Sequence, residues 1–158
     1  MIRYKDSLAS SYANLGSVFW RQENHAAAAD AFARGLAVQP EHLGLLSNDA
    51  ELALVQGDKD RFRRRIAEAL PQATTRNDLS AILPFLVWLD NPTQGWDSVM
   101  TAIRKLEPGW VTFGWNFSTT APVIARLDAS TQQTAQHFIA FFTGQIDLPT
   151  LEERLTGR

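Results

Sequence analysis

The side chains that most often perform catalysis are few and scattered in this sequence. His25, His42 and His137 stand far apart, and none belongs to a His-Glu-x-x-His motif. Glu152 and Glu153 are adjacent, so on a helix their side chains diverge and cannot face each other as an acid and base pair. The sequence also lacks a glycine-rich phosphate loop. We therefore expect a protein that is not an enzyme and that uses no metal or other cofactor.

One strongly basic cluster, residues 61–65, contains four arginines around Phe62. Arg64 lies four residues from both Asp60 and Glu68, a spacing at which side chains meet on a helix. We interpret the cluster as a solvated outer helix face on which Arg64 pairs with these acids and Phe62 faces the core. A site for an acidic partner or nucleic acid is the alternative.

The segment 109–117 is the most aromatic part of the chain, with four aromatic side chains among nine residues. Such a segment can form a platform for a ligand, or it can close the apolar end of a fold. We favour the second interpretation, a plug.

The composition excludes several classes of protein. The chain has 158 residues, 15 basic against 17 acidic side chains, a net charge of −2 and no cysteine. Disulfides and cysteine-ligated metal sites are thus excluded, and the charge argues against nucleic acid as a partner. The longest apolar run, 81–89, has nine residues and contains Pro84, whereas a membrane span needs about 20. Because no secretory signal is visible either, we expect a cytoplasmic protein with no membrane partner.

Self-similarity at a fixed period organises most of the chain. Asn14 recurs as Asn48, and Phe32 recurs as Ile66 and Met100. The repeat period equals the separation between Asn14 and Asn48. It divides the chain into three units, 9–42, 43–76 and 77–110. A chain with such a period is expected to stack similar supersecondary units, each of which cannot bury its apolar face alone.

Each of the first two units predicts two helices. In the first unit an apolar stripe at i, i+3, i+4 and i+7 predicts a helix over about 7–22; it consists of Tyr12, Leu15, Gly16 and Phe19. After a polar break at Glu23-Asn24, a second helix runs to about Val38 and is stopped by Pro40. Gly16 and Ala28 allow the two helices to approach closely; Leu15, Phe19 and Phe32 are expected to fill the space around the crossing. The second unit repeats this pattern around a break at Gly57-Asp58, with Leu70 on its second apolar stripe.

The remaining sequence predicts further helices. In the third unit Pro84 falls inside the first helix, and Asn91 is placed to cap a second helix that starts at Pro92. Thr120 can cap a helix over 121–128, and Ser130 has capping-box spacing to Gln133. A final short helix carries Leu148, Leu151 and Leu155. We interpret 111–158 as an atypical helical cap that packs on the three repeats within the same domain.

The first unit resembles the tetratricopeptide repeat, a helix–turn–helix module. The resemblance rests on Tyr12-Ala13-Asn14-Leu15-Gly16, Phe19, Ala28, Phe32, Gly35, Leu36 and Pro40. The second unit matches moderately and the third weakly, so about two-thirds of the chain is covered. Four residues depart from the family's pattern: Asp49 replaces an apolar residue, and Phe62, Pro84 and Trp96 replace small ones. The resemblance implies an all-α, right-handed superhelical stack of antiparallel helix hairpins, with seven or eight helices.

The resemblance also implies that the first helix of each unit lines a concave groove. The residues beside the core stripes of these helices are polar at one end of the groove and apolar at the other. The polar candidates are Asn14, Ser17, Arg21, Asn48 and Glu51. The apolar candidates are Trp20, Leu54, Val55, Phe85 and Trp88. Alternatively, the apolar residues pack against the next unit or the cap. The alternative for each asparagine is a hydrogen bond within its own repeat.

These observations together predict a non-enzymatic protein-interaction module. Its partner would be a peptide or helix of another protein, of unknown identity, held by a few apolar anchors in a preformed groove. The alternative is a structural module that self-associates as a homo-oligomer or docks onto a larger polypeptide.

Overall fold

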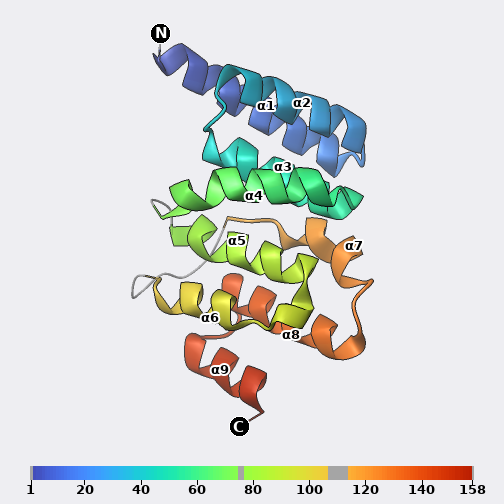
Figure 1. Ribbon diagram of the computed structural model, residues 1–158, viewed down its shortest axis with the longest axis vertical. Coiled ribbons are helices and arrows are strands. Elements are labelled where there is room, and N and C mark those ends of the chain that lie inside the picture. The colour runs from blue at the N-terminus through green and yellow to red at the C-terminus, as the bar shows by residue number, and fades with distance from the viewer. Residues whose placement is uncertain (1, 75–76, 107–113, 158) are drawn as a thin grey trace. The chain divides into compact units, whose positions relative to one another are not determined.

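A computed structural model describes residues 2–74, 77–106 and 114–157 (Figure 1). All regular elements in these ranges are helical, with nine α-helices, two short 3-10 helices and no strand. The α-helices are α1 (Ile2–Arg21), α2 (His25–Val38), α3 (Leu43–Gln56), α4 (Lys59–Ala73), α5 (Asn77–Asp90), α6 (Asp97–Arg104), α7 (Ala121–Ile124), α8 (Ala129–Phe142) and α9 (Leu148–Thr156). The 3-10 helices are η1 (Pro92–Gln94) and η2 (Phe117–Thr120). The all-α prediction is confirmed, but the described residues form nine α-helices instead of the seven or eight expected.

The chain forms two compact units, Met1–Leu86 and Val87–Arg158, whose boundary falls inside α5. The sequence instead places its division after residue 110, at the end of the third repeat. Residue 110 lies outside the described residues, so that division stays a prediction.

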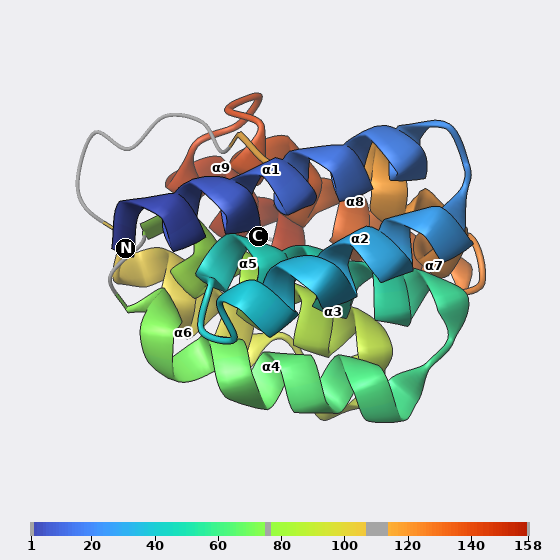
Figure 2. The ribbon, with the colours of Figure 1, turned by 90° about the horizontal axis from the view of Figure 1, so that it is seen from above.

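Unit 1 contains two helix hairpins. α1 packs against α2, α3 packs against α4, and α3 also contacts both helices of the first hairpin. Figures 1 and 2 both show α1 and α2 as antiparallel neighbours, with α3 and α4 paired in the same way. These are the helix pairs that the first two repeat periods predict. Leu70 of α4 was expected in the core but is 39% exposed.

Capping side chains explain where the helices of unit 1 begin. Asn24 caps α2 by accepting a hydrogen bond from the backbone N–H of Ala27 at 3.1 Å. Asp58 caps α4 by accepting one from the N–H of Arg61 at 3.1 Å. Just before it, Gly57 ends α3 with a φ of 76°, a left-handed conformation that favours glycine. The breaks that the sequence places at both positions are confirmed.

Close packing in unit 1 depends on glycine at two helix contacts. A Cβ on Gly16 would lie 2.3 Å from Cε1 of the fully buried Phe32, so only glycine lets α1 approach this ring. A Cβ on Gly35 would lie 2.6 Å from Cδ1 of Leu45, where α2 meets α3. The predicted close approach at Gly16 is confirmed. Leu15 was also expected to fill the space at this crossing, but it is 43% exposed. It is the neighbour of Gly16 along the helix, so its side chain points in a different direction from the Gly16 position.

Unit 2 has a small aromatic core. The Phe117 and Phe142 rings stack with centroids 5.4 Å apart, and Trp88 meets Phe138 edge to face at 5.6 Å. Phe117 ends the aromatic segment 109–117, of which the structure describes residues 114–117. Phe117 therefore packs within unit 2, and the prediction that the whole segment plugs the fold stays untested.

Several predicted caps in the C-terminal half are wrong. Asp128, not Ser130, caps α8, and its carboxylate accepts hydrogen bonds from both the hydroxyl and the N–H of Thr131. These bonds hold the pKa of Asp128 below its ordinary value. Thr120 and Asn91 sit at helix starts without a side-chain capping bond. The helix that Thr120 precedes has four residues instead of the eight expected.

α5 runs continuously through Pro84. Residues on every side of this helix are buried, including Ala81, Ile82, Leu83 and Phe85. We infer that tertiary packing on all sides offsets the backbone hydrogen bond that proline removes.

Candidate functional site

The apolar residues predicted to line the groove are largely buried. Trp20, Leu54, Val55, Phe85 and Trp88 have exposed fractions of 9% or less. The Trp20 ring meets Phe32 edge to face at 6.4 Å, in the core of the first hairpin. These side chains therefore present little surface to a ligand in this conformation, and their predicted contacts with a partner stay untested.

The polar groove candidates divide into two groups. Asn14 and Arg21 are exposed on α1, whereas Ser17 and Asn48 are half-buried. The Ser17 hydroxyl donates a hydrogen bond to the backbone oxygen of Ala13. Glu51 is almost fully buried in α3. Asn14 and Arg21 are thus the predicted groove residues that a partner reaches most easily.

Two of the four arginines, Arg61 and Arg65, form a partly buried ionic network with Asp49 instead of the predicted surface pairs, whereas Arg63 and Arg64 are exposed. Arg65 Nε donates to Oδ2 of Asp49 at 2.7 Å, and Arg61 Nε lies 3.5 Å from the other carboxylate oxygen. Arg65 Nη1 also donates to Glu68 at 2.9 Å, so Arg65 rather than Arg64 pairs with this acid. The expectation for Arg64 is wrong because Arg61 and Arg65, one turn apart, face α3, where Asp49 lies.

Two opposing effects set the pKa of Arg65, namely burial and the neighbouring acids. Partial burial by itself lowers the pKa of a guanidinium, because it disfavours the charged form. The hydrogen bonds and charges of Asp49 and Glu68 outweigh burial and raise the pKa of Arg65 above its ordinary value. Arg65 therefore stays charged across the neutral pH range.

His42 and Glu152 each have a partner in the structure. His42 caps α3, its Nδ1 accepting a hydrogen bond from the N–H of Leu45 at 3.2 Å. Glu152 forms an ion pair with Arg104 on α6 at 2.9 Å, and Glu153 is exposed. Among the described residues, no three histidine, cysteine, aspartate or glutamate side chains cluster as metal ligands.

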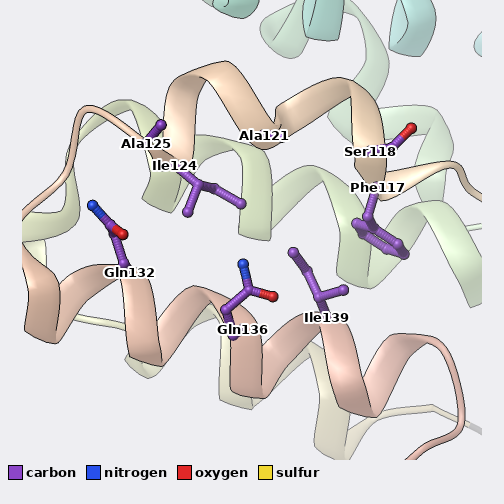
Figure 3. Close-up of a pocket in the computed structure, with 8 residues that line it drawn as sticks. All are labelled: Phe117, Ser118, Ala121, Ile124, Ala125, Gln132, Gln136 and Ile139. Carbon is purple, nitrogen blue, oxygen red and sulfur yellow. The ribbon is translucent and has the colours of Figure 1, made fainter.

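An open cleft lies within unit 2, between α8 on one side and η2 with α7 on the other (Figure 3). Its volume is about 370 Å³, within the range of sites for small ligands. The lining residues are Phe117, Ser118, Ala121, Ile124, Ala125, Gln132, Gln136 and Ile139. None of them is charged.

The cleft combines an apolar floor with two side-chain amides. Phe117 and Ile124 point from η2 and α7 toward Ile139 on α8 (Figure 3). Gln132 and Gln136 rise from α8 one helical turn apart, with the Gln136 amide in the gap between the helices (Figure 3). The two walls are close in sequence, so unit 2 forms this cleft by itself.

The amides can recognise a peptide backbone. Gln132 donates its N–H to the backbone oxygen of Leu127 at 2.7 Å, which fixes the side chain and leaves its carbonyl oxygen as an acceptor. Gln136 offers both a donor and an acceptor, the combination that pairs with one peptide group. The cleft therefore suits an uncharged segment with an apolar side chain.

Sequence reasoning missed this cleft because its residues have unremarkable types. The one signal is the spacing of Gln132 and Gln136, four residues apart beside the apolar stripe of α8. The opposite wall depends on the position of α7 beside α8, which no pattern of neighbouring residues in the sequence indicates.

His137, on α8, has a pKa below its ordinary value. Desolvation is the main cause and the positive charge of Arg154 on α9 adds to it. The folded protein therefore binds this proton more weakly than the unfolded chain, so stability is lost as the pH falls below the unfolded value of about 6.5. We expect urea midpoints to fall between about pH 7.5 and pH 5.5, and His137→Gln to reduce this fall. Equal falls in both proteins would show that His137 does not contribute.

Comparison with known proteins identifies no relative: no family model matches this chain, and neither does any curated protein or solved structure. In the described residues, no helix has the length and apolar character that crossing a membrane requires.

Proposed function

We propose that this protein is a non-enzymatic interaction module that binds a peptide of a partner protein, and that the cleft between α7 and α8 is the peptide site. The observation that carries the proposal is the lining of this cleft, in which two glutamine amides stand beside an apolar floor without a charged group. Amides pair with a peptide backbone, and the floor, in which Ile139 is more exposed than the nearly buried Phe117 and Ile124, holds one apolar side chain.

The proposal extends to the helix hairpins of unit 1. Their pairing supports a tetratricopeptide-like stack, whose right-handed superhelix and concave groove are part of the proposal. Asn14 and Arg21 are exposed on α1 and would supply polar contacts on that surface. Trp20 and Phe85 would stabilise the stack from within, because both are buried.

Nuclear magnetic resonance with short blocked peptides tests the peptide site. The probes are N-acetylated, C-amidated tetrapeptides of alanine with one central leucine, aspartate or lysine. We expect the leucine peptide to shift the amide signals of residues 117–125 and 132–139, and the charged peptides to shift them less. The cleft has no counter-charge to offset the desolvation of a charged side chain.

A matched pair of variants locates the contact. Gln136→Ala removes one backbone-pairing amide and should weaken binding of the leucine peptide about fivefold, the effect of one hydrogen bond. Gln133→Ala is the control, because Gln133 is exposed on the same helix but does not line the cleft. Equal effects of the two changes would contradict the site. Shifts confined to α1 and α3 would move peptide binding to the groove of the repeats.

A further inference from the structure

The cleft of unit 2 has two unlike walls. The wall on η2 and α7 presents small, exposed side chains at a spacing of i, i+3 and i+7, namely Ser118, Ala121 and Ala125. The wall on α8 presents longer side chains at a spacing of i, i+4 and i+7, namely Gln132, Gln136 and Ile139. Ala125 lies at the same end of the cleft as Gln132, and Ser118 lies at the same end as Ile139 (Figure 3). The cleft is thus a short channel between a wall of small side chains and a wall that carries two amides.

The two amides are spaced to meet an extended chain. Gln132 and Gln136 are four residues apart on α8, so their positions along the helix axis differ by about 6 Å. Two residues of an extended strand span about 6.6–6.8 Å. Strand residues two apart direct their backbone N–H and C=O groups to the same edge. One extended segment that lies along α8 can therefore present the backbone groups of two alternate residues to the two amides.

The opposite wall leaves room for such a segment without competing for its backbone. Ala121 and Ala125 end at a methyl group, so their side chains neither reach across the cleft nor form hydrogen bonds. The Ser118 hydroxyl donates its proton to Oδ1 of Asn116 at 2.7 Å. Recognition of the backbone therefore falls to the α8 wall. A helical segment would not use that wall, because the N–H and C=O groups inside a helix already bond to one another.

The apolar floor determines which residue of the segment enters the cleft. In an extended chain successive side chains point to opposite faces, so the two residues that pair with the amides have their side chains on the same face. The side chain of the residue between them points to the other face. The floor of Phe117, Ile124 and Ile139 has room for one apolar side chain. The middle residue therefore faces the floor, and the side chains of both neighbours point toward solvent.

We propose that the cleft binds an extended segment of a partner protein in a fixed register. A central apolar residue enters the floor, and the backbone groups of its two neighbours pair with Gln132 and Gln136. The central residue is uncharged, because the lining has no charged group to offset its desolvation. The neighbours are free in residue type, because their side chains point away from the cleft. This inference rests on the peptide site proposed above and adds the conformation and register of the bound segment.

N-methylation of a peptide tests the register without changing the protein. The probe is the blocked pentapeptide acetyl-Ala-Ala-Leu-Ala-Ala-amide, titrated into the full chain and followed by the amide signals of residues 117–125 and 132–139. An N-methyl group on the alanine before or after the leucine removes an N–H that faces α8, so each should weaken binding at least about fivefold. N-methylation of the leucine is the control. Its N–H faces the wall of small side chains, so binding should fall less than about twofold.

Gln136→Ala links the pattern to α8, and because Gln136 is exposed the change should leave the fold intact. One of the two sensitive N-methyl groups should lose its effect in this variant, because the amide that faced it is gone, whereas Gln133→Ala should keep both effects. Equal weakening by all three N-methyl groups, or the strongest weakening at the leucine, would overturn the register and leave the peptide site in place. So would a pattern that Gln136→Ala does not change. A pentapeptide that shifts no signal of the cleft would overturn the peptide site and the register together.

Discussion

Replacing Gly16 with valine should destabilise the protein by about 3 kcal/mol, at the upper end of the usual cost of overpacking. A Cβ at this position would meet Cε1, Cδ1 and Cζ of Phe32 at 2.3, 2.5 and 2.9 Å. The Phe32 ring is fully buried and touches Trp20, so it cannot move aside without disturbing the hairpin core. Urea unfolding followed by tryptophan fluorescence and circular dichroism measures the change.

A double-mutant cycle isolates the contact. Phe32→Leu removes ring atoms that the new side chain would strike, so Gly16→Val/Phe32→Leu should be less destabilised than the sum of the single changes by about 1 kcal/mol or more. Gly57→Ala provides a comparison without a clash, because its Cβ has no neighbour within 4 Å. It should cost only about 1 kcal/mol, from the left-handed backbone. Additive effects in the cycle would show that the Gly16–Phe32 contact does not control the packing.

The fold of unit 1 could be predicted because its signals are local. The repeat period, the apolar stripe of α1 and the capping residues Asn24 and Asp58 all act within one hairpin or between neighbouring ones. The caps of the C-terminal half were harder to assign. Asp128 and Ser130 lie two residues apart and both have oxygen acceptors, so the cap depends on which residue adopts an extended backbone. Asp128 has a ψ of 161°, whereas Ser130 already lies inside α8.

The groove residues were harder to predict. The spacing of apolar residues shows which way a side chain points only when the helix is amphipathic. In α3 every residue from Leu45 to Val55 is buried except the half-buried Asn48. α5 is likewise apolar on all sides. On such helices the sequence does not distinguish a residue that faces a groove from one that faces the next helix, so Leu54 and Phe85 fitted both roles. The cleft of unit 2 depends on tertiary pairing and had no comparable signal.

Asp49 connects the departures of the sequence from the repeat pattern with the stability of unit 1. It occupies a position where the tetratricopeptide pattern has an apolar residue, yet it is 3% exposed. A carboxylate at this depth is tolerated because Arg65 and Arg61 on α4 reach it. The basic cluster and the buried acid, which look unrelated in the sequence, therefore form one ionic contact between α3 and α4.

Asp49→Leu, which restores the apolar residue of the repeat pattern, should nevertheless destabilise the protein by about 2–3 kcal/mol. The change leaves two guanidinium groups beside an apolar side chain, each with only about a fifth of its side chain exposed. Arg65 then keeps only the exposed Glu68 as an acid partner, and Arg61 keeps only Asp58 at 3.5 Å. The expected value lies below the cost for a fully buried pair, because water still reaches part of each arginine. Urea unfolding at neutral pH gives the free energy of each variant.

Two further variants separate the charge of Asp49 from its volume. Asp49→Leu/Arg65→Met removes both the acid and its closest partner and should recover at least half of the lost stability, as replacing a whole buried pair by apolar side chains often does. Glu68→Gln removes the exposed acid on the same arginine and should cost less than about 1 kcal/mol, because Glu68 is 42% exposed. If Glu68→Gln proved as costly as Asp49→Leu, the surface part of the network would carry the stabilisation. If the double variant were no more stable than Asp49→Leu, the loss would come from misfit of the leucine in α3 rather than from the missing contact between Asp49 and Arg65.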